Sequence, residues 1–354
     1  MKNNRKISIK IFNGFDDELL NLWKDFEKDS ANTCFQSYKY IEQYIKFFKD
    51  EKIKNIILVV ELNQKIIAIF PFEIIDYFGF KILRWLGTKN FDYCGPLLCK
   101  KKFFNKNLFH EIWNDCQKAI GKIDIILLNK QLDLIDDIKN PFTEFLSNIN
   151  YSKIYLIKLP EENDNYILNI ENKKFLAEFL RTTKKISSNY EVFFKCISIA
   201  DKDLTVTDIL NKKNNLLSLK KIKNNFNLKN INFLNNMRDK YPELINLHAV
   251  YIDKKIIAAN LGINYKKKFY YLIPVIFIEE FNKFSPGKLL LNYLVNKAIE
   301  NKLDKFDFGY GEENYKKYWS NEIINISTYI NYKTIRGFLF YCLIKIYLIF
   351  KNIK

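Results

Sequence analysis

The chain has 354 residues, which predicts two domains at about 100 to 200 residues each and excludes a single small module. Hydrophobic residues make up 48% and charged residues 27% of the chain, a composition that excludes disorder as the main state. The formal net charge of +17 fits nucleic acid, a membrane surface or a phosphate-bearing cofactor as partner. Because most of the basic residues are dispersed lysines, composition alone does not choose among them.

The first half of the chain predicts one mixed-sheet α/β domain. A hairpin is expected over residues 56–72, with a tight turn at Asn63 and Gln64 between two apolar strands. Around it the apolar periodicity predicts helices over 15–26, 38–48 and 103–119, and strands over 82–86 and 123–128.

The second half repeats this pattern. It predicts helices over 173–187 and 205–225, a hairpin over 246–262, and a strand over 269–275 that Pro274 interrupts. The tetrapeptide Lys-Ile-Ile-Ala follows the turn of each hairpin, at Lys65 and at Lys255, which indicates a duplicated domain. We assign residues 1–160 and 161–335 to the two domains and 336–354 to a basic, apolar C-terminal helix.

The C-terminal segment allows two interpretations. Residues 337–350 are apolar, but Lys345 interrupts them and they fall short of the ~20 residues that span a bilayer. The helix either packs on the core or lies at a membrane surface with Lys345, Lys351 and Lys354 facing anionic lipid.

Cysteine usage and the chain start both favour a cytoplasmic protein. The six cysteines have no regular spacing, which is typical of reduced thiols. Cys94 and Cys99 lack the spacing of a zinc knuckle, so no metal is expected. The N-terminus shows no apolar run like that of a secretory signal.

A strand, a loop and a helix meet at Ser285, Pro286, Gly287 and Lys288. Ser285 suits the N-cap, Pro286 the first helical position, and Gly287 leaves room for a ligand near the backbone. A helix that starts in this way offers free N–H groups to a phosphate. The alternative is an ordinary capped helix.

A second loop, which contains glycine, follows the strand that begins at Lys305. Together with the motifs before it, this loop gives an order of motifs that can be compared with known families. In this order the chain resembles the branch of the GNAT superfamily associated with cellulose and exopolysaccharide synthesis, which is related to the Fem-type aminoacyltransferases. The resemblance rests on residues 35–37, 69–71, 86–87, 92–97, 285–290, 306–309 and 315–316.

The resemblance implies two tandem GNAT-like domains, with acetyl-CoA or another acyl-CoA in the second domain and the acceptor in the cleft between them. The loop from Ser285 to Lys288 is expected to bind the pyrophosphate, and the edge formed by Tyr271, Leu272 and Ile273 to hold the pantetheine arm. Because Pro274 cannot donate a ladder hydrogen bond, this strand should part from its neighbour where the thioester lies.

Acyl transfer to an amine needs a base and an acid. Glu312 or Glu313 is the expected base and Tyr315 the expected acid, with exposed loop residues as the alternative. Asp307, inside an apolar strand, is expected to be a buried carboxylate that is either structural or orients the substrate. Asp307 and Lys316 are both assigned to the substrate site.

The first domain offers two further acceptor contacts, Asp92 and Tyr93, in a loop that contains glycine and proline. The alternative is a turn without a ligand. His248, one of two histidines, is expected to be a hydrogen-bonded structural residue.

The favoured hypothesis is a cytoplasmic, acyl-CoA-dependent N-acyltransferase that acts on an amino sugar or another small amine, for a surface polysaccharide. One alternative is a Fem-type transferase that uses aminoacyl-tRNA; nucleic acid is disfavoured because arginines are few, but the sequence leaves tRNA open. The other is a non-catalytic scaffold of a polysaccharide-synthesis complex, bound at the inner face of the membrane through the C-terminus.

Overall fold

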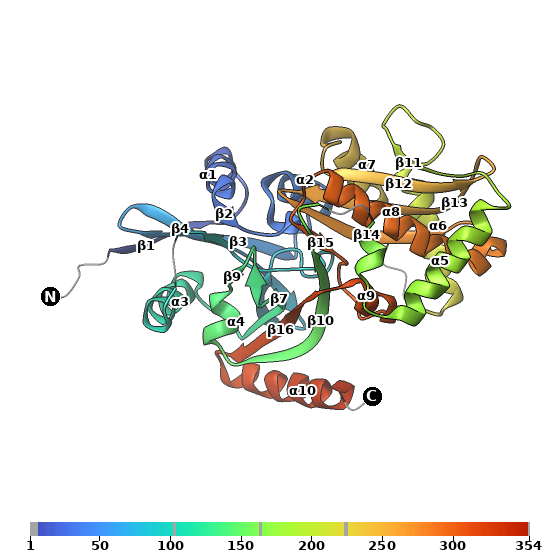
Figure 1. Cartoon of the computed structure of the whole chain (residues 1–354). Helices are drawn as coiled ribbons and strands as arrows, with labels where there is room; N and C mark the ends of the chain where they lie inside the picture. Colours follow the sequence, from blue (N-terminus) through green and yellow to red (C-terminus); the bar gives the residue numbers. More distant parts are fainter. Residues whose placement is uncertain (1–5, 102–103, 163–164, 223–225, 353–354) are drawn as a thin grey trace. The chain divides into compact units, whose positions relative to one another are not determined.

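The structure is a computed structural model that describes residues 6–101, 104–162, 165–222 and 226–352 (Figure 1). The chain forms two compact units, Met1–Lys153 together with Ile324–Lys354, and Ile154–Ile323. Each unit has a mixed sheet with helices packed on it, so the predicted mixed α/β class is confirmed.

The first unit is built on a sheet with the strand order β1 (Ile7–Phe12), β3 (Ile53–Leu62), β4 (Lys65–Tyr77), β5 (Phe80–Trp85), β7 (Ile125–Leu132) and β16 (Glu322–Tyr332). β5 and β7 are parallel, whereas β16 and β7 are antiparallel. The sequence analysis placed residues 324–335 in the second domain. They lie in the first unit instead, because β16 pairs with β7 there.

The α-helices described in this unit are α1 (Asp17–Lys28), α2 (Tyr38–Phe48), α3 (Lys106–Ile120), α4 (Pro141–Phe145) and α10 (Ile335–Asn352). Its short elements are β2 (Ser30–Ala31), η1 (Cys34–Gln36), β6 (Leu97–Cys99), β8 (Leu134–Ile135) and β9 (Ile138–Lys139). Helix α2 has the predicted bounds, and α1 begins at Asp17 because the Asp16 carboxylate accepts a hydrogen bond from the Leu19 N–H at 2.8 Å. The predicted start of the third helix, residue 103, lies outside the described residues.

The second unit has the strand order β10 (Asn148–Lys158), β15 (Lys305–Asp307), β14 (Lys268–Ile276), β13 (Lys255–Tyr265), β12 (Ile245–Ile252) and β11 (Val192–Ile197). Its helices are η2 (Tyr166–Asn169), α5 (Lys173–Ser187), α6 (Val206–Leu219), α7 (Leu228–Lys240), η3 (Glu279–Phe284), α8 (Pro286–Glu300) and α9 (Asn314–Trp319). Helix α5 has the predicted bounds. Helix α6 was predicted over 205–225 but ends at Leu219, and residues 223–225 lie outside the described residues.

The two predicted hairpins are present and share their irregularities. β3 and β4 join through Asn63 and Gln64, and β12 and β13 through Asp253 and Lys254; all four residues have positive φ, as type I′ turns require. The ladder register shifts between Val60 and Glu61 in the first hairpin. It shifts between Val250 and Tyr251 in the second, which is the equivalent position.

Both faces of the sheet in the second unit are covered by other elements, and the two faces do not share one apolar cluster. The side chains of Ala258, Phe269 and Tyr271 share one apolar cluster with helices α5 and α8. Ala259 and Val275 alternate with these positions along β13 and β14, so they point to the opposite face, and both are buried outside that cluster. Helix α6 also packs against β13 and β14.

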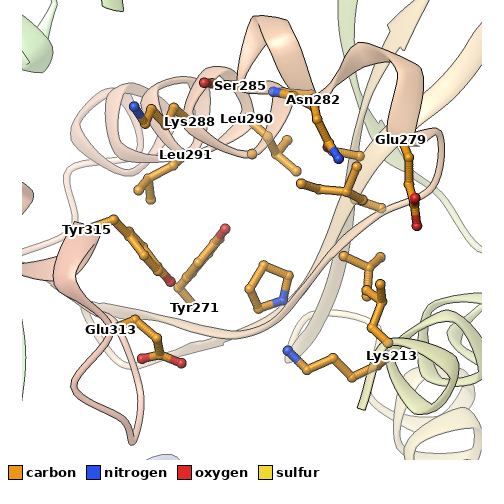
Figure 2. A pocket seen from close by; sticks show the side chains of 18 of the residues that line it. Lys213, Tyr271, Glu279, Asn282, Ser285, Lys288, Leu290, Leu291, Glu313 and Tyr315 are labelled. Carbon is orange, nitrogen blue, oxygen red and sulfur yellow. The ribbon is translucent and has the colours of Figure 1, made fainter. Parts of the chain in front are cut away.

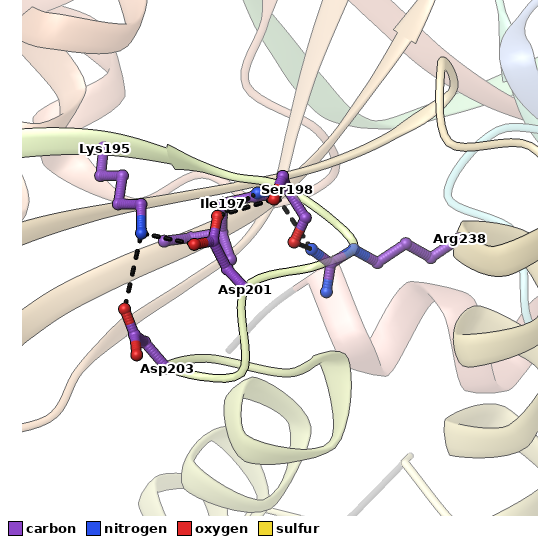
Figure 3. A network of polar contacts seen from close by, with 6 residues as sticks. All are labelled: Lys195, Ile197, Ser198, Asp201, Asp203 and Arg238. Carbon is purple, nitrogen blue, oxygen red and sulfur yellow. Dashed lines mark hydrogen bonds and ion pairs between the residues drawn. The ribbon is translucent and has the colours of Figure 1, made fainter.

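A polar network closes the end of β11 (Figure 3). The buried Arg238 donates to the main-chain carbonyls of Ile197 at 2.9 Å and Ser198 at 2.8 Å. Asp201 accepts from the Ser198 N–H at 2.8 Å and pairs with Lys195 at 2.6 Å. These bonds tie the turn after β11 to helix α7.

The C-terminal segment forms a helix, of which the structure describes some side chains. Residues 335–352 are helical, and within the described part of the chain no helix has both the length and the hydropathy of a membrane span. Of the lysines expected to face lipid, Lys354 and the side chains of Lys345 and Lys351 lie outside what the structure describes.

Candidate functional site

The site begins where two parallel strands of the second unit separate. β14 pairs with β15 only from Lys268–Lys305 to Tyr270–Asp307. Beyond Tyr270, β14 continues to Ile276 with no described strand on that side, while its pairing with β13 persists and places Pro274 opposite Asn260. The expected parting of the strands is therefore present, but it starts before Pro274, because β15 ends at Asp307.

A bulge changes the direction of the side chains on β14 at the same point. Gly262 pairs with Tyr271 and Leu261 with Ile273, so Leu272 is an extra residue on β14. A side chain at Gly262 would collide with the Phe269 ring, which explains the glycine. The bulge places Tyr271 and Pro274 on the same face of the sheet, three residues apart.

A cavity of about 600 Å³ lies along this open edge of β14 (Figure 2). Its lining combines strands β13 and β14, the start of α8, η3, helix α6 and the start of α9. Its lining residues include Lys213, Tyr271, Pro274, Gly287, Lys288, Glu313 and Tyr315.

The start of α8 differs from the predicted cap. Ser285 precedes the helix, but it has a left-handed backbone with φ 51° and its side chain makes no capping hydrogen bond. Its N–H donates to the Asn282 carbonyl at 2.9 Å, and the Lys288 N–H donates to the Ser285 carbonyl at 2.9 Å. Pro286 has no N–H, and no partner within the described part of the chain accepts from the Gly287 N–H.

Gly287 and Lys288 are well placed to meet a ligand. A Cβ at Gly287 would have no atom within 4 Å, so packing does not require glycine there. The Lys288 ammonium lies 4.9 Å from the centre of the Phe175 ring and 3.5 Å from a Glu178 oxygen. Both residues line the cavity, as Ser285 and Pro286 do, whereas Leu272 and Ile273 do not.

Two further groups that line the cavity, Tyr315 and Glu313, differ in protonation. Burial raises the pKa of Tyr315, and the nearby Glu313 raises it further, so the phenol keeps its proton. Burial also tends to raise the pKa of Glu313, but the hydrogen bond and the charge of Lys316 outweigh it, and the net pKa is lowered. The cavity thus presents a protonated phenol beside an ionised carboxylate.

Lys316 shapes the loop rather than the cavity. Its side chain is 3% exposed, pairs with Glu313 at 2.8 Å and donates to the carbonyls of Tyr310 at 3.2 Å and Gly311 at 3.1 Å. Because its donors are spent on the loop and it does not line the cavity, the substrate contact expected of Lys316 has no support here.

The other residues that the sequence predicts for the site do not line the cavity. Asp307 is buried, and its carboxylate accepts from the Gly309 N–H at 2.8 Å, which shapes the turn after β15. Glu312 is exposed and does not line the cavity. In the first unit, Tyr93 is fully buried against Phe35 at 5.7 Å, while Asp92 is half-buried.

His248 lies outside the cavity, buried between the rings of Phe269 and Tyr293. Burial and the charge of Lys297 lower its pKa to about 4. The sequence analysis expected a hydrogen-bonded residue, but Nδ1 has no hydrogen-bond partner among the described residues. His248 is therefore a neutral core residue.

Lys213 is a cavity residue that the sequence analysis missed. It extends from α6 into the cavity (Figure 2), and no hydrogen bond or ion pair is described for its ammonium group. The pKa of Lys213 is lowered, mainly by burial and also by the charges of Lys220 and Lys316, although the charge of Glu313 opposes this shift. Nothing in the sequence distinguishes Lys213, because Lys and Arg together number 57 and Lys212 precedes it directly.

A comparison with protein families identifies this part of the chain. Residues 173–317 match the family described as acetyltransferase (GNAT) domain, and every residue of the cavity falls within this range. This match supports an acyltransferase. No curated protein matches the chain in sequence.

Several solved structures share the fold of the whole chain. FemX superposes with a TM-score of 0.56 at 12% identity, over 92% of this chain and 95% of that one. A tandem GNAT protein from the clavulanic acid biosynthesis pathway gives 0.52 at 9%, over 93% and 100%. L-PGS from Bacillus licheniformis gives 0.52 at 9%, over 93% and 95%. At these identities the likeness shows the fold alone, which is that of tandem GNAT proteins.

Proposed function

We propose that the chain is an acyl-CoA-dependent N-acyltransferase that acts on an amino sugar or another small amine, in the synthesis of a surface polysaccharide. The observation that carries this proposal is the cavity along the open edge of β14, which Gly287, Lys288, Glu313 and Tyr315 all line. The expected branch of the superfamily and the polysaccharide acceptor rest on the resemblance given above.

The residues present fit an acyl-CoA. The Gly287 N–H, the positive end of the α8 dipole and the Lys288 ammonium are suited to phosphate oxygens. Main-chain groups of β14 beyond Tyr270, on the side that β15 has left, are suited to the amides of an extended pantetheine arm. An acyl-CoA bound there supplies the thioester carbonyl that an amine attacks.

Two side chains then move the protons. The Glu313 carboxylate takes the proton from the attacking amine, directly or through water, and the Tyr315 phenol gives a proton to the departing thiolate. The ion pair with Lys316 keeps Glu313 in position at 2.8 Å. Lys213 holds an anionic group of the donor or of the acceptor, because it lines the cavity and no residue that the structure describes forms an ion pair with its ammonium.

Thermal unfolding with coenzyme A and acetyl-CoA, at low and high salt, tests the proposal. A ligand at about 100 times its dissociation constant adds about 2.7 kcal/mol to the free energy of unfolding. Gly287→Tyr should abolish this gain by filling the space at the helix start, whereas Gly287→Ala, the matched control, should keep it. Absence of any shift in the unsubstituted protein at low salt would overturn the proposal.

Aminoacyl transfer from tRNA is the alternative that such a negative result would favour. The FemX-like fold fits it but does not distinguish it, because the tandem GNAT protein has the same fold. The arginines do not favour it: Arg84 pairs with Glu73, Arg336 with Asp124, and Arg238 donates to main-chain carbonyls. A gel-shift titration with aminoacylated tRNA at two salt concentrations would measure this binding directly.

A further inference from the structure

One face of helix α10 carries large apolar side chains that are exposed. Ile335, Leu339 and Leu343 are 89%, 65% and 62% exposed, and Phe338 and Ile346 follow the same spacing at 43% and 50%. Positions separated by three and four residues lie on one side of a helix. These five side chains therefore form a continuous apolar strip.

The opposite side of α10 holds the helix on the first unit. Gly337 lies directly on the main chain of Asp124, where a side chain would collide with the Asp124 carbonyl oxygen. The Phe340 ring stacks on Phe80 with centroids 5.0 Å apart. The apolar strip is therefore the outward side of a helix that is already docked.

The turn between β4 and β5, which contacts the first turn of α10, carries an exposed aromatic ring. Phe78 is 86% exposed and has a positive φ of 51°. Arg336 donates to the Gly79 carbonyl at 2.9 Å, which fixes this turn to the first turn of α10. Phe78 and the five exposed residues of α10 are called the α10 face below.

Positive charge gathers at the same end of the helix. A second cavity, of about 840 Å³, is lined by Lys81, Lys118, Lys122, Lys333 and Arg336. Asp124 pairs with Arg336 at 2.6 Å and Asp115 pairs with Lys118 at 2.8 Å. No acidic partner is described for Lys81, Lys122 or Lys333, so positive charge borders the apolar strip.

We infer that the α10 face binds the surface of a bilayer that contains anionic lipid. A contiguous exposed apolar patch marks an interaction surface, and an apolar helix face bordered by lysines suits the boundary between acyl chains and anionic headgroups. A protein partner would need to match the strip and the lysines together, whereas anionic lipid offers both chemistries in one surface. This inference is independent of the proposed enzymatic function.

Vesicle co-sedimentation of the full chain tests it. Vesicles of equal parts phosphatidylcholine and phosphatidylglycerol should retain the protein, phosphatidylcholine alone should not, and high salt should weaken the retention. The double variant Leu339→Glu and Leu343→Glu should lower the bound fraction about tenfold by removing apolar contact and adding negative charge.

The matched control is the double variant Leu219→Glu and Leu228→Glu, because both side chains are 76% exposed and lie outside the α10 face. It carries the same added charge and should bind as the unsubstituted chain does. Retention of the coenzyme A thermal shift, or else of the melting temperature, shows that each variant is folded.

Two outcomes would overturn the inference. One is equal binding to both kinds of vesicle, or to neither. The other is a concentration-dependent dimer in light scattering that Leu339→Glu and Leu343→Glu abolish, which would make the α10 face an interface between two copies of the chain.

Discussion

Glu312 and Glu313 are adjacent in the chain but have different surroundings. Both side chains are exposed, but Glu313 lines the cavity and pairs with Lys316, whereas Glu312 does not line it. We expect Glu313→Gln to lower kcat by roughly 10² to 10⁴, the range for loss of a general base. Glu312→Gln should keep the rate of the unsubstituted chain in the same acyl-transfer assay, and a larger loss for Glu312→Gln would reverse the assignment.

Lys213 offers a second test at the residue scale. If its ammonium binds an anionic group, Lys213→Met should raise the KM of that substrate roughly tenfold or more, because a hydrogen bond to a charged group is worth about 1.5–3 kcal/mol. The kcat should change little. Lys212→Met is the control, since Lys212 donates to the Phe277 carbonyl at 3.1 Å and does not line the cavity. Equal KM values for the two variants would contradict the role.

His248 should make stability depend on pH. The pKa of His248 is about 4 in the native protein and 6.5 for an exposed histidine, so between these values the unfolded chain binds more protons than the native one. Its contribution to the free energy of unfolding is complete above pH 6.5 and should fall by about 1.4 kcal/mol per pH unit as the pH drops toward 4. Denaturant unfolding at several pH values measures this slope.

Substitution of His248 separates this group from the carboxylates that titrate at lower pH. His248→Gln removes the titration but keeps a polar side chain, so its stability should depend less steeply on pH between 6.5 and 4. An unchanged slope in this variant would show that other groups cause the acid sensitivity.

At the scale of the element, the start of α8 is a strained turn rather than a side-chain cap. Ser285 has φ 51° and makes no capping hydrogen bond. Ser285→Gly should therefore stabilise the protein by about 1 kcal/mol, because glycine adopts positive φ without the steric cost. Ser285→Ala should be nearly neutral in the same thermal unfolding experiment. A loss of about 1 kcal/mol in Ser285→Ala would instead show that the hydroxyl does cap the helix.

The cavity also depends on how strands and helices are arranged. It needs β15 to end while β14 continues, the bulge at Leu272, and helices α6 and α8 against the same strands. Each of these is local to the second unit. The residues that line the cavity, from Lys213 to Tyr315, therefore come from one continuous stretch of the chain.

At the scale of the whole molecule, the chain returns to its first unit after completing the second. β16 pairs with β7 and buries Ile326, Tyr329 and Ile330. Burial of such side chains contributes about 1.5–3 kcal/mol each, a large share of the roughly 5–15 kcal/mol that stabilises a domain. Removal of residues 324–354 should therefore unfold the first unit.

Truncation after residue 334 is the control for this prediction, because it removes α10 and keeps β16. Hydrogen exchange of β5 and β7 should be fast in the longer deletion and slow in the control. Slow exchange in both proteins would show that the first unit is stable without its last strand.

The sequence determined most of the elements, because their patterns are local. The apolar periodicity of α2 and α5 and the paired turn residues of the two hairpins are read within a window of 10 to 20 residues. The motif order also indicated the GNAT domain that the family comparison shows. Gly287, Lys288 and Tyr315, which line the cavity, were among the residues it singled out.

The tertiary structure decided which charged side chains of the site face the cavity. The sequence does not distinguish Glu313 from Glu312 or Lys213 from Lys212. It also does not distinguish a lysine that lines the cavity from Lys316, whose ammonium binds the main chain of its own loop. These choices depend on where β15 ends, on the bulge in β14 and on the register of α6, which are set by long-range pairing and packing. The return of β16 to the first unit has the same cause, because strand pairing joins residues about 200 positions apart and leaves no local signal in either strand.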